Sequence, residues 1–200
     1  MMKSVDEILS FWFGEGDPNA AESMRFPLWF QGSPELDREI RERFFGRIED
    51  AALGRLEDWK QTPRGRLAWT ILLDQFTRNA YRDSPRMYGF DPLALQSTRE
   101  AVASGQHLEL PLIQRGFLYL PLEHAEELPA QEESVALYQA LAKEARGLPI
   151  EGAMTGMLDY SVRHERVVRR FGRFPHRNEL LSRQSTAEER AFLASDEAPF

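Results

Sequence analysis

The stretch of residues 160–178 gathers side chains that could bind an anion or move a proton. Between Arg163 and Arg177 there are six arginines, two histidines and one acid, Glu165, in a 200-residue chain whose net charge is −7. This local reversal of charge requires a cause. A bound anion, a bound acidic surface, or acidic side chains folded against the stretch from elsewhere in the chain would each supply one.

The end of this stretch is predicted to form a rigid turn. A helix ends at Gly172, and Pro175 prevents the backbone that follows from continuing it. Four polar residues would then project over the helix end, and forked guanidinium groups in such a place suit an anion. The predicted ligand-binding residues of the turn are Arg173, Arg177 and Asn178, and its histidine, His176, is a candidate acid or base.

His164 lies on the inward stripe of the helix expected over residues 156–171. Met157, Tyr160, His164, Val168 and Phe171 recur at the spacing of one helix face. A single histidine on an apolar face is usually a satisfied core residue. Because His176 and several arginines follow closely, a catalytic role for His164 is kept beside the structural one.

A second polar group lies on the helix expected over residues 66–82. Asp and Asn are unfavourable inside helices, so a face that carries them calls for an explanation. One reading is a solvated face with an ion pair from Asp74 to Arg78. The other is a groove in which Asp74 positions an arginine. The residues that share this face are Asp74, Gln75, Arg78, Asn79 and Arg82.

A third group, Glu123, His124 and Glu126, follows Pro121, which is expected to end or kink a helix. Two acids beside a histidine could be metal ligands or an acid–base set. His124 could equally cap a helix end. Catalytic roles are therefore predicted for His124, His164, His176, Asp74 and Glu123, and Arg78 and Asn79 join the ligand-binding set. We expect Asp74, Arg78, His124, His164, Arg173 and His176 to converge in space.

The elements that must position these groups are all expected to be helices. Ser33-Pro34, Thr62-Pro63 and Asp91-Pro92 each give a cap followed by proline at the first helical position, 29 residues apart, which hints at an α-solenoid. Capping boxes are predicted at Ser4 and Ser185. No stretch alternates with the period of a strand. The sequence predicts one all-α domain over residues 1–200, a compact array of eight to ten helices.

Composition excludes several classes of protein. The chain has no cysteine, which rules out disulfides and thiolate metal sites and fits a reducing compartment. There is no export leader and no apolar run long enough to span a bilayer, so a cytoplasmic location without a membrane partner is expected. The acidic balance argues against nucleic acid. No motif implies a cofactor, and the oligomeric state is not predicted.

Four runs of the sequence together resemble one family. They are residues 8–14, 72–79, 120–126 and 170–178, the last followed by Ser185-Thr186. These runs are similar to those of the bacterial domain-of-unknown-function 924 family, over essentially the whole chain. The resemblance implies a tetratricopeptide-like helical fold and no established activity. The resemblance leads us to expect proline at the position of Thr77. Because threonine stands there instead, that helix should be straighter.

Three classes of function remain open from the sequence. The first is a helical module that binds a small anionic ligand or an acidic peptide through Arg78, Arg173 and Arg177. The second is a hydrolase-type enzyme that uses histidine and carboxylate acid–base or metal chemistry. The third is a scaffold for protein interaction in which the same groups form a buried ion-pair network.

Overall fold

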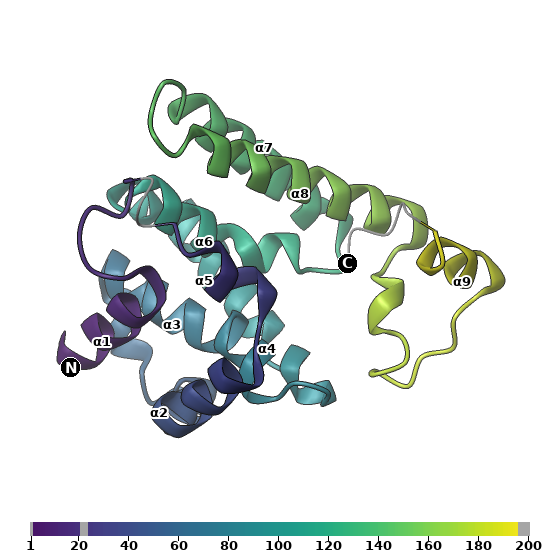
Figure 1. Cartoon of the computed structure of the whole chain (residues 1–200), viewed down its shortest axis with the longest axis horizontal. Coiled ribbons are helices and arrows are strands. Elements are labelled where there is room, and N and C mark those ends of the chain that lie inside the picture. Colours follow the sequence, from purple (N-terminus) through teal and green to yellow (C-terminus); the bar gives the residue numbers. More distant parts are fainter. Residues whose placement is uncertain (1, 21–23, 196–200) are drawn as a thin grey trace.

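The computed structural model describes residues 2–20 and 24–195, and every regular element in that part of the chain is helical (Figure 1). This confirms the all-α prediction. The described residues form nine α-helices. They are α1 (Met2–Phe13), α2 (Pro34–Ala52), α3 (Pro63–Asp74), α4 (Phe76–Ala80), α5 (Asp91–Ala103), α6 (Leu112–Glu123), α7 (Leu128–Glu144), α8 (Glu151–Phe171) and α9 (Ala187–Leu193).

Two of the three cap-and-proline signals work as predicted. The Ser33 hydroxyl accepts a hydrogen bond from the Leu36 amide at 3.1 Å and opens α2, and the Thr62 hydroxyl accepts one from the Gly65 amide at 3.2 Å and opens α3. Such bonds satisfy amides that a helix start leaves without a partner. At α5 the pattern differs. The N-cap is Phe90, and the Asp91 carboxylate forms an ion pair with Arg78.

Both predicted capping boxes are corrected by the structure. The first helix already includes Met2, so Ser4 lies inside α1, where its hydroxyl accepts from Arg47 at 3.2 Å. The C-terminal box is shifted by one residue: Thr186, not Ser185, caps α9, and it pairs with Glu189.

The helix expected over residues 66–82 is interrupted at Gln75, which separates α3 from α4. The prediction of one continuous helix is therefore wrong, whereas the comparison of Thr77 with proline stays a prediction. The Thr77 hydroxyl bonds back to the carbonyls of Leu73 at 2.9 Å and Asp74 at 3.3 Å. Back-bonding of this kind competes with the helix ladder and bends it. As a result Asp74 ends α3 as a fully buried residue and not on a solvated face.

Pro121 does not end its helix where the sequence suggested. Helix α6 continues through Pro121 to Glu123 and is capped by His124. Glu123 and His124 are thus held at the last turn of a buried helix.

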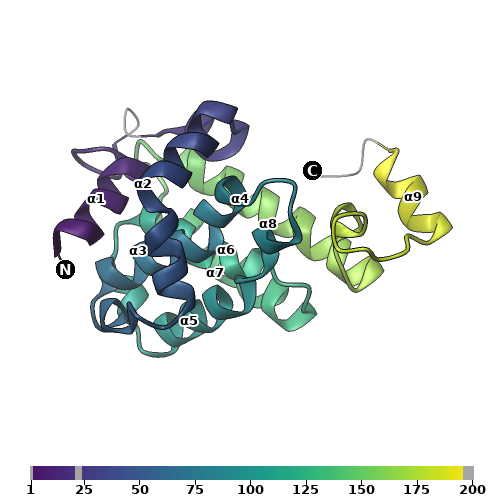
Figure 2. The same cartoon turned by 90° about the horizontal axis from the view of Figure 1, so that it is seen from below.

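The helices pack as a body with one extended end. Helices α7 and α8 lie side by side above the others in Figure 1, and α6 packs against both of them. Helix α3 is central, because it contacts α1, α2, α5 and α6. Figure 2 shows α9 at one end of the molecule, beyond the C-terminal end of α8. Among the described residues, no helix has the length and apolar content needed to cross a bilayer.

Aromatic side chains fill the core between the first helices and α6. Trp12, Phe76 and Phe117 are almost fully buried, and Trp12 makes edge contacts with the other two at centroid separations of 5.4 and 6.0 Å. Trp29, in the short helical turn Pro27–Gln31, donates its indole hydrogen to the Trp12 carbonyl at 2.9 Å. These contacts hold the turn against the body, where it forms one wall of the cavity described next.

Candidate functional site

A cavity of about 470 Å³, which we call the histidine cavity, brings together most of the polar residues singled out from the sequence. It lies where α3–α4, the end of α6, the middle of α8 and the turn after α8 meet. The predicted residues that line it are Arg78, Asn79, Glu123, His124, His164, His176 and Arg177. Asp74 lies directly behind this wall. Positions spread over about a hundred residues therefore converge, with the exceptions given below.

Asp74 and His124 form a buried acid–histidine pair. His124 Nδ1 is 2.7 Å from one carboxylate oxygen of Asp74, and the Gln75 amide donates to the other oxygen at 2.6 Å. Burial raises the pKa of Asp74, but the charge and hydrogen bond of His124, with smaller contributions from Arg78 and Gln75, outweigh it and leave the pKa below its ordinary value. A carboxylate only accepts, so His124 Nδ1 carries the hydrogen. This leaves Nε2 as the ring atom that can accept a proton when the imidazole is uncharged.

Glu123 is a carboxyl group that holds its proton. Its side chain is 5% exposed, and its Oε2 atom has no hydrogen-bond partner among the described residues. Burial, and then the charge of Asp74, raises the pKa of Glu123 to about 8. At neutral pH it is therefore mostly uncharged and able to donate a hydrogen bond.

The two other histidines of the cavity are neutral. His164 Nδ1 donates to the Tyr160 carbonyl at 2.9 Å and lies 3.5 Å from Glu123 Oε1. Burial lowers the pKa of His164 to about 3, despite that hydrogen bond. Burial, followed by the charge of Arg177, lowers the pKa of His176 to about 3. The cavity thus holds an uncharged acid beside uncharged imidazoles.

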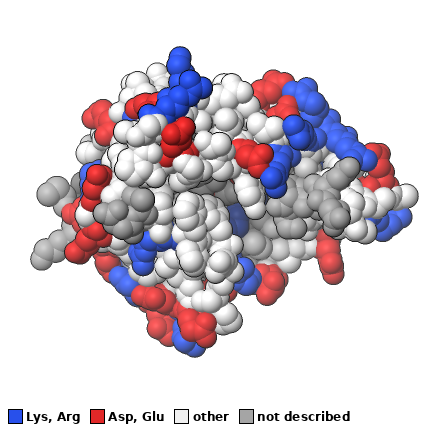
Figure 3. All heavy atoms as spheres, turned by 45° about the horizontal axis from the view of Figure 1, so that its top comes forward, with Lys and Arg blue, Asp and Glu red and all other residues white. Residues whose placement is uncertain are grey.

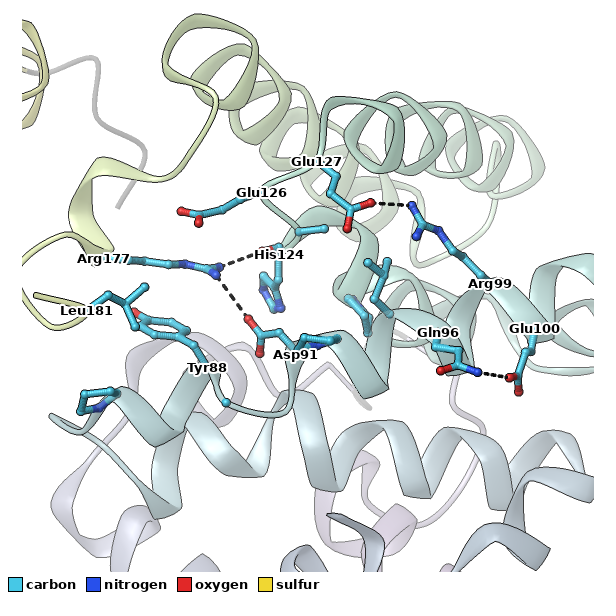
Figure 4. A pocket seen from close by; sticks show the side chains of 16 residues that line it. Tyr88, Asp91, Gln96, Arg99, Glu100, His124, Glu126, Glu127, Arg177 and Leu181 are labelled. Atoms are coloured by element: carbon cyan, nitrogen blue, oxygen red, sulfur yellow. Dashed lines mark hydrogen bonds and ion pairs between the residues drawn. The ribbon is translucent and has the colours of Figure 1, made fainter. Parts of the chain in front are cut away.

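Asp91 joins two arginines at the cavity wall. Arg78 contacts the Asp91 carboxylate at 2.8 Å from α4, and Arg177 contacts it at 3.3 Å from the turn after α8. Arg177 also donates to the His124 carbonyl at 3.0 Å, and Figure 4 shows it reaching between that residue and Asp91. Both guanidinium groups lie within 5 Å of the centre of the Tyr88 ring, at 4.8 and 4.4 Å. Burial raises the pKa of Asp91, although both arginines lower it.

A neighbouring cavity, shown in Figure 4, has a volume of about 570 Å³. It shares Tyr88, His124 and Arg177 with the histidine cavity. Its remaining charged residues are acids and one arginine, Arg99, that is paired with Glu127 at 3.0 Å. The histidine cavity, by contrast, is lined by three imidazoles, the Glu123 carboxyl group and the guanidinium groups of Arg78, Arg82 and Arg177.

Two predicted ligand-binding residues lie away from the histidine cavity. Arg173 forms a fork with the Glu189 carboxylate of α9, at 2.7 and 2.9 Å, and the Asn178 amide donates to Ser185 at 3.0 Å. The turn at residues 174–175 sends Arg173 toward α9 and Arg177 toward α5. The expectation that Arg173 converges with the other groups is therefore wrong.

The ion pair expected from Asp74 to Arg78 is also corrected, because Asp74 pairs with His124 and Arg78 with Asp91. The charge reversal near the end of α8 has its cause within the chain, since five of its six arginines contact carboxylates of this protein. These pairs are Arg163 with Asp159, Arg169 with Glu132 and Glu165, Arg170 with Glu188, Arg173 with Glu189, and Arg177 with Asp91.

No group of three or more His, Asp or Glu side chains in the described part of the chain is arranged to hold a metal ion. The trio of Glu123, His124 and Glu126 does not act as a unit. Glu126 turns away to Arg183 at 2.6 Å and to the Phe174 amide at 2.7 Å.

Sequence reasoning missed several residues of the site. The sequence predicts Asp91 as a helix cap and Tyr160 as part of an inward stripe, and it gives no functional signal for Trp29 and Phe30. Tyr88, Tyr160, Trp29 and Phe30 line the histidine cavity, as do Gln75 and Arg82 of the polar face. The only signal for Asp91 was that aspartate can serve as an ion-pair partner as well as a cap.

The match to a family model covers residues 8–197, and the family is described as bacterial protein of unknown function (DUF924). The chain belongs to the DUF924 family. A solved structure, that of a protein of unknown function, ATU0120, from Agrobacterium tumefaciens, is similar to this chain. The two are 34% identical, with a TM-score of 0.81, over 96% of this chain and 98% of that one. None of the curated proteins compared with the chain matches it.

His164, His176 and Glu123 of this DUF924 member together predict a stability maximum near pH 6.5. His164 and His176 have folded pKa values of about 3 against an ordinary 6.5, so below pH 6.5 the unfolded chain takes up protons that the folded chain refuses. Glu123 keeps its proton up to about pH 8 against an ordinary 4.5, so stability falls as the pH rises through that window. Between pH 4.5 and 6.5 the two histidines outweigh the one glutamate.

Above the maximum, the Glu123 contribution exceeds what remains of the contribution of the two histidines. We expect the free energy of unfolding to fall by about 1 kcal/mol between pH 6.5 and 8. Urea unfolding at a series of pH values measures this, and Glu123→Gln should abolish the decline over the same interval. An equal decline in both proteins would show that Glu123 is ionised in the folded state.

Proposed function

We propose that the histidine cavity is the active site of a hydrolase-type enzyme that acts on a small molecule by acid–base catalysis. The observation that carries the proposal is the Asp74–His124 pair beside the protonated Glu123 at one cavity. A base held by a buried carboxylate and an acid of raised pKa are the two partners that proton transfer needs. Perturbed titrating groups gather at functional sites more often than elsewhere.

In the proposed step, His124 Nε2 takes a proton from a water molecule. The water oxygen bonds to the electrophilic centre of the substrate, and the bond to the leaving group breaks. Glu123 gives its proton to the leaving atom, so that the elements of water are added across the bond. The imidazolium then returns its proton to the Glu123 carboxylate, directly or through solvent, and both groups regain their starting states. Asp74 positions the imidazole and stabilises its charge.

Arg78 and Arg177 would contribute as positioned hydrogen-bond donors. Their charges are already opposed by Asp91, but Arg177 Nε has no hydrogen-bond partner among the described residues. Together with Glu123 Oε2 it is a buried polar atom for which a substrate could supply the missing partner. A donor fixed in a site of low dielectric stabilises charge that develops on a substrate oxygen.

The test is a screen of carboxylic ester, phosphoric ester and amide substrates with the parent protein and Glu123→Gln. For any substrate that the parent hydrolyses, the rate should fall above about pH 8, where Glu123 loses its proton. Glu123→Gln should lower that rate about a hundredfold and remove this limb of the pH profile. Arg163→Ala, at an exposed ion pair on α8, serves as the control and should act like the parent. Hydrolysis unaffected by Glu123→Gln would end the proposal.

The second candidate is a binding module for small anions. It is favoured by the presence of Arg78, Arg82 and Arg177 with Asn79 at one cavity. Against it, Asp91 neutralises two of these arginines and Asp37 holds the third at 2.5 Å. A saturable rise in melting temperature with phosphate at constant ionic strength, lost in Arg177→Ala, would favour this function. A third possibility, a scaffold whose ion pairs only stabilise the fold, accounts less well for the cavity that these groups line.

Three expectations about the fold, the domain and the location accompany this proposal. We keep the tetratricopeptide-like arrangement and a single domain over residues 1–200 as predictions. A cytoplasmic location remains a proposal that is supported by the absence of cysteine. The small-molecule substrate takes the place of the acidic peptide, because the cavity volume of about 470 Å³ falls in the range of small-molecule sites.

A further inference from the structure

An apolar groove of about 520 Å³ adjoins the histidine cavity. It runs along one face of α8 and is bounded on the other side by the aromatic residues of the segment before α2. Four residues line both spaces: Phe30, Leu120, Glu123 and Tyr160. The groove and the cavity are therefore one continuous site with an apolar arm and a polar arm, and Glu123 lies at the junction.

Two of the residues that line the groove are glycines of one helix. Gly152 and Gly156 belong to α8, and a Cβ atom added at either would meet no atom within 4 Å. Their backbone does not need glycine, because neither has a positive φ. Glycine disfavours a helix interior relative to alanine, so Gly156, in the second turn of α8, requires another reason. Here their effect is to keep a channel along the helix surface open.

The rim of the groove exposes aromatic surface to solvent. Phe26, Phe30 and Tyr160 are 43%, 58% and 50% exposed, and the first two rings are stacked at a centroid distance of 6.2 Å. Figure 3 shows that one face of the molecule is hollowed near its centre, with mostly uncharged atoms around the hollow and charges toward the periphery. Exposed apolar surface beside a polar pocket is typical of a ligand site.

We propose that the ligand of this site is amphiphilic, with a single aliphatic chain in the apolar groove and a polar acyl or phosphoryl head group in the histidine cavity. The assignment of the head group rests on the proposed function, whereas that of the chain rests on the groove alone. A partner helix or a second copy of this chain fits less well. Either would cover the groove with side chains and leave the buried Glu123 Oε2 at the junction unmatched.

Glu123 suits this junction. A carboxyl group that keeps its proton can lie beside an aliphatic chain without a buried charge, and it still offers a hydrogen bond to the first polar atom of the head group. The order of groups along the site, from apolar groove to Glu123 to the histidines, is thus the order of groups along an amphiphile.

The test measures binding of sodium decanoate below its micelle concentration by isothermal titration calorimetry, with acetate as the head group alone. The parent should bind decanoate in a saturable way and acetate at least tenfold more weakly. Gly156→Leu places a side chain in the groove and should weaken decanoate binding at least tenfold. Gly46→Leu is the matched control, because Gly46 is an exposed glycine of α2 whose Cβ would also meet no atom within 4 Å. It should leave binding unchanged.

Equal decanoate affinity in the parent and Gly156→Leu, or no saturable binding, would overturn the proposal. A dimer in sedimentation analysis that Gly156→Leu dissociates would also overturn it, and would assign the groove to a second copy. The outcome is separable from that of the proposed function. Decanoate binding that Gly156→Leu weakens, in a protein that hydrolyses no substrate, would sustain the chain site and end the enzyme proposal. Hydrolysis that requires Glu123 but does not change with the chain length of the substrate or with Gly156→Leu would sustain the enzyme proposal and end the proposal of a chain site.

Discussion

Replacing Asp91 by alanine should lower the free energy of unfolding by about 3–5 kcal/mol. The carboxylate contacts Arg78 and Arg177, whose side chains are 19% and 8% exposed. Its removal leaves two guanidinium groups near one ring, that of Tyr88, without the negative charge between them. Because water reaches these groups poorly, the repulsion and the lost hydrogen bonds are only weakly screened. Urea unfolding monitored by circular dichroism measures the change.

Asp159→Ala provides the matched control for this experiment. Asp159 also pairs with an arginine, Arg163 at 2.6 Å, but the two side chains are 57% and 50% exposed. An exposed pair contributes about 0–1 kcal/mol, so this variant should unfold close to the parent. If Asp91→Ala cost no more than Asp159→Ala, Arg78 and Arg177 would have to be solvated in the folded protein. They would then be available for an anion after all.

Asp74→Asn should reduce hydrolysis of any substrate found in the screen about a thousandfold or more. The carboxylate fixes the hydrogen on His124 Nδ1 and leaves Nε2 as the base. An asparagine amide can present its NH₂ group to Nδ1 and so favour the opposite tautomer, in which Nε2 carries the hydrogen and cannot take another proton. The size of the protein core is preserved, so the effect on rate should exceed the effect on folding.

If Asp74 had a structural role alone, Asp74→Asn would not change the tautomer of His124, which NMR can measure. The ¹⁵N shifts of the His124 ring should show protonation at Nδ1 in the parent at high pH and a shift of the hydrogen toward Nε2 in Asp74→Asn. Thr70→Val, a substitution at a buried position on the same helix, serves as the control and should leave both the tautomer and the rate unchanged. An unchanged tautomer in Asp74→Asn together with a parental rate would remove Asp74 from the mechanism.

Local signals in the sequence predicted the helices well because their causes are local. The caps of α2 and α3 form between a side chain and an amide three residues away, and proline follows each cap. Gly172 adopts the left-handed conformation that ends α8. Such interactions depend on a few neighbouring residues, so a pattern of four or five letters predicts them.

The site was predicted less completely because its pairings are decided by tertiary structure. Arg173 and Arg177 are four positions apart, yet one pairs with Glu189 and the other with Asp91. A chain with 25 basic and 32 acidic residues offers many possible pairs, and sequence spacing does not choose among them. The break at Gln75 likewise follows from back-bonding by Thr77 that no periodicity reveals. It is this break that ends α3 at Asp74, within reach of His124.

The turn Pro175–Arg177 has a consequence for the protein during its synthesis. Arg177 reaches Asp91 and the His124 carbonyl across sequence separations of 86 and 53 residues. The ribosome synthesises Asp91 and His124 before Arg177. Helices α3 to α7 can therefore pack before this wall of the cavity has formed. The nascent chain would thus expose Asp91 and Arg78 to solvent until Arg177 has emerged. Contacts of such long range form late, and the site would become competent only when folding is almost complete.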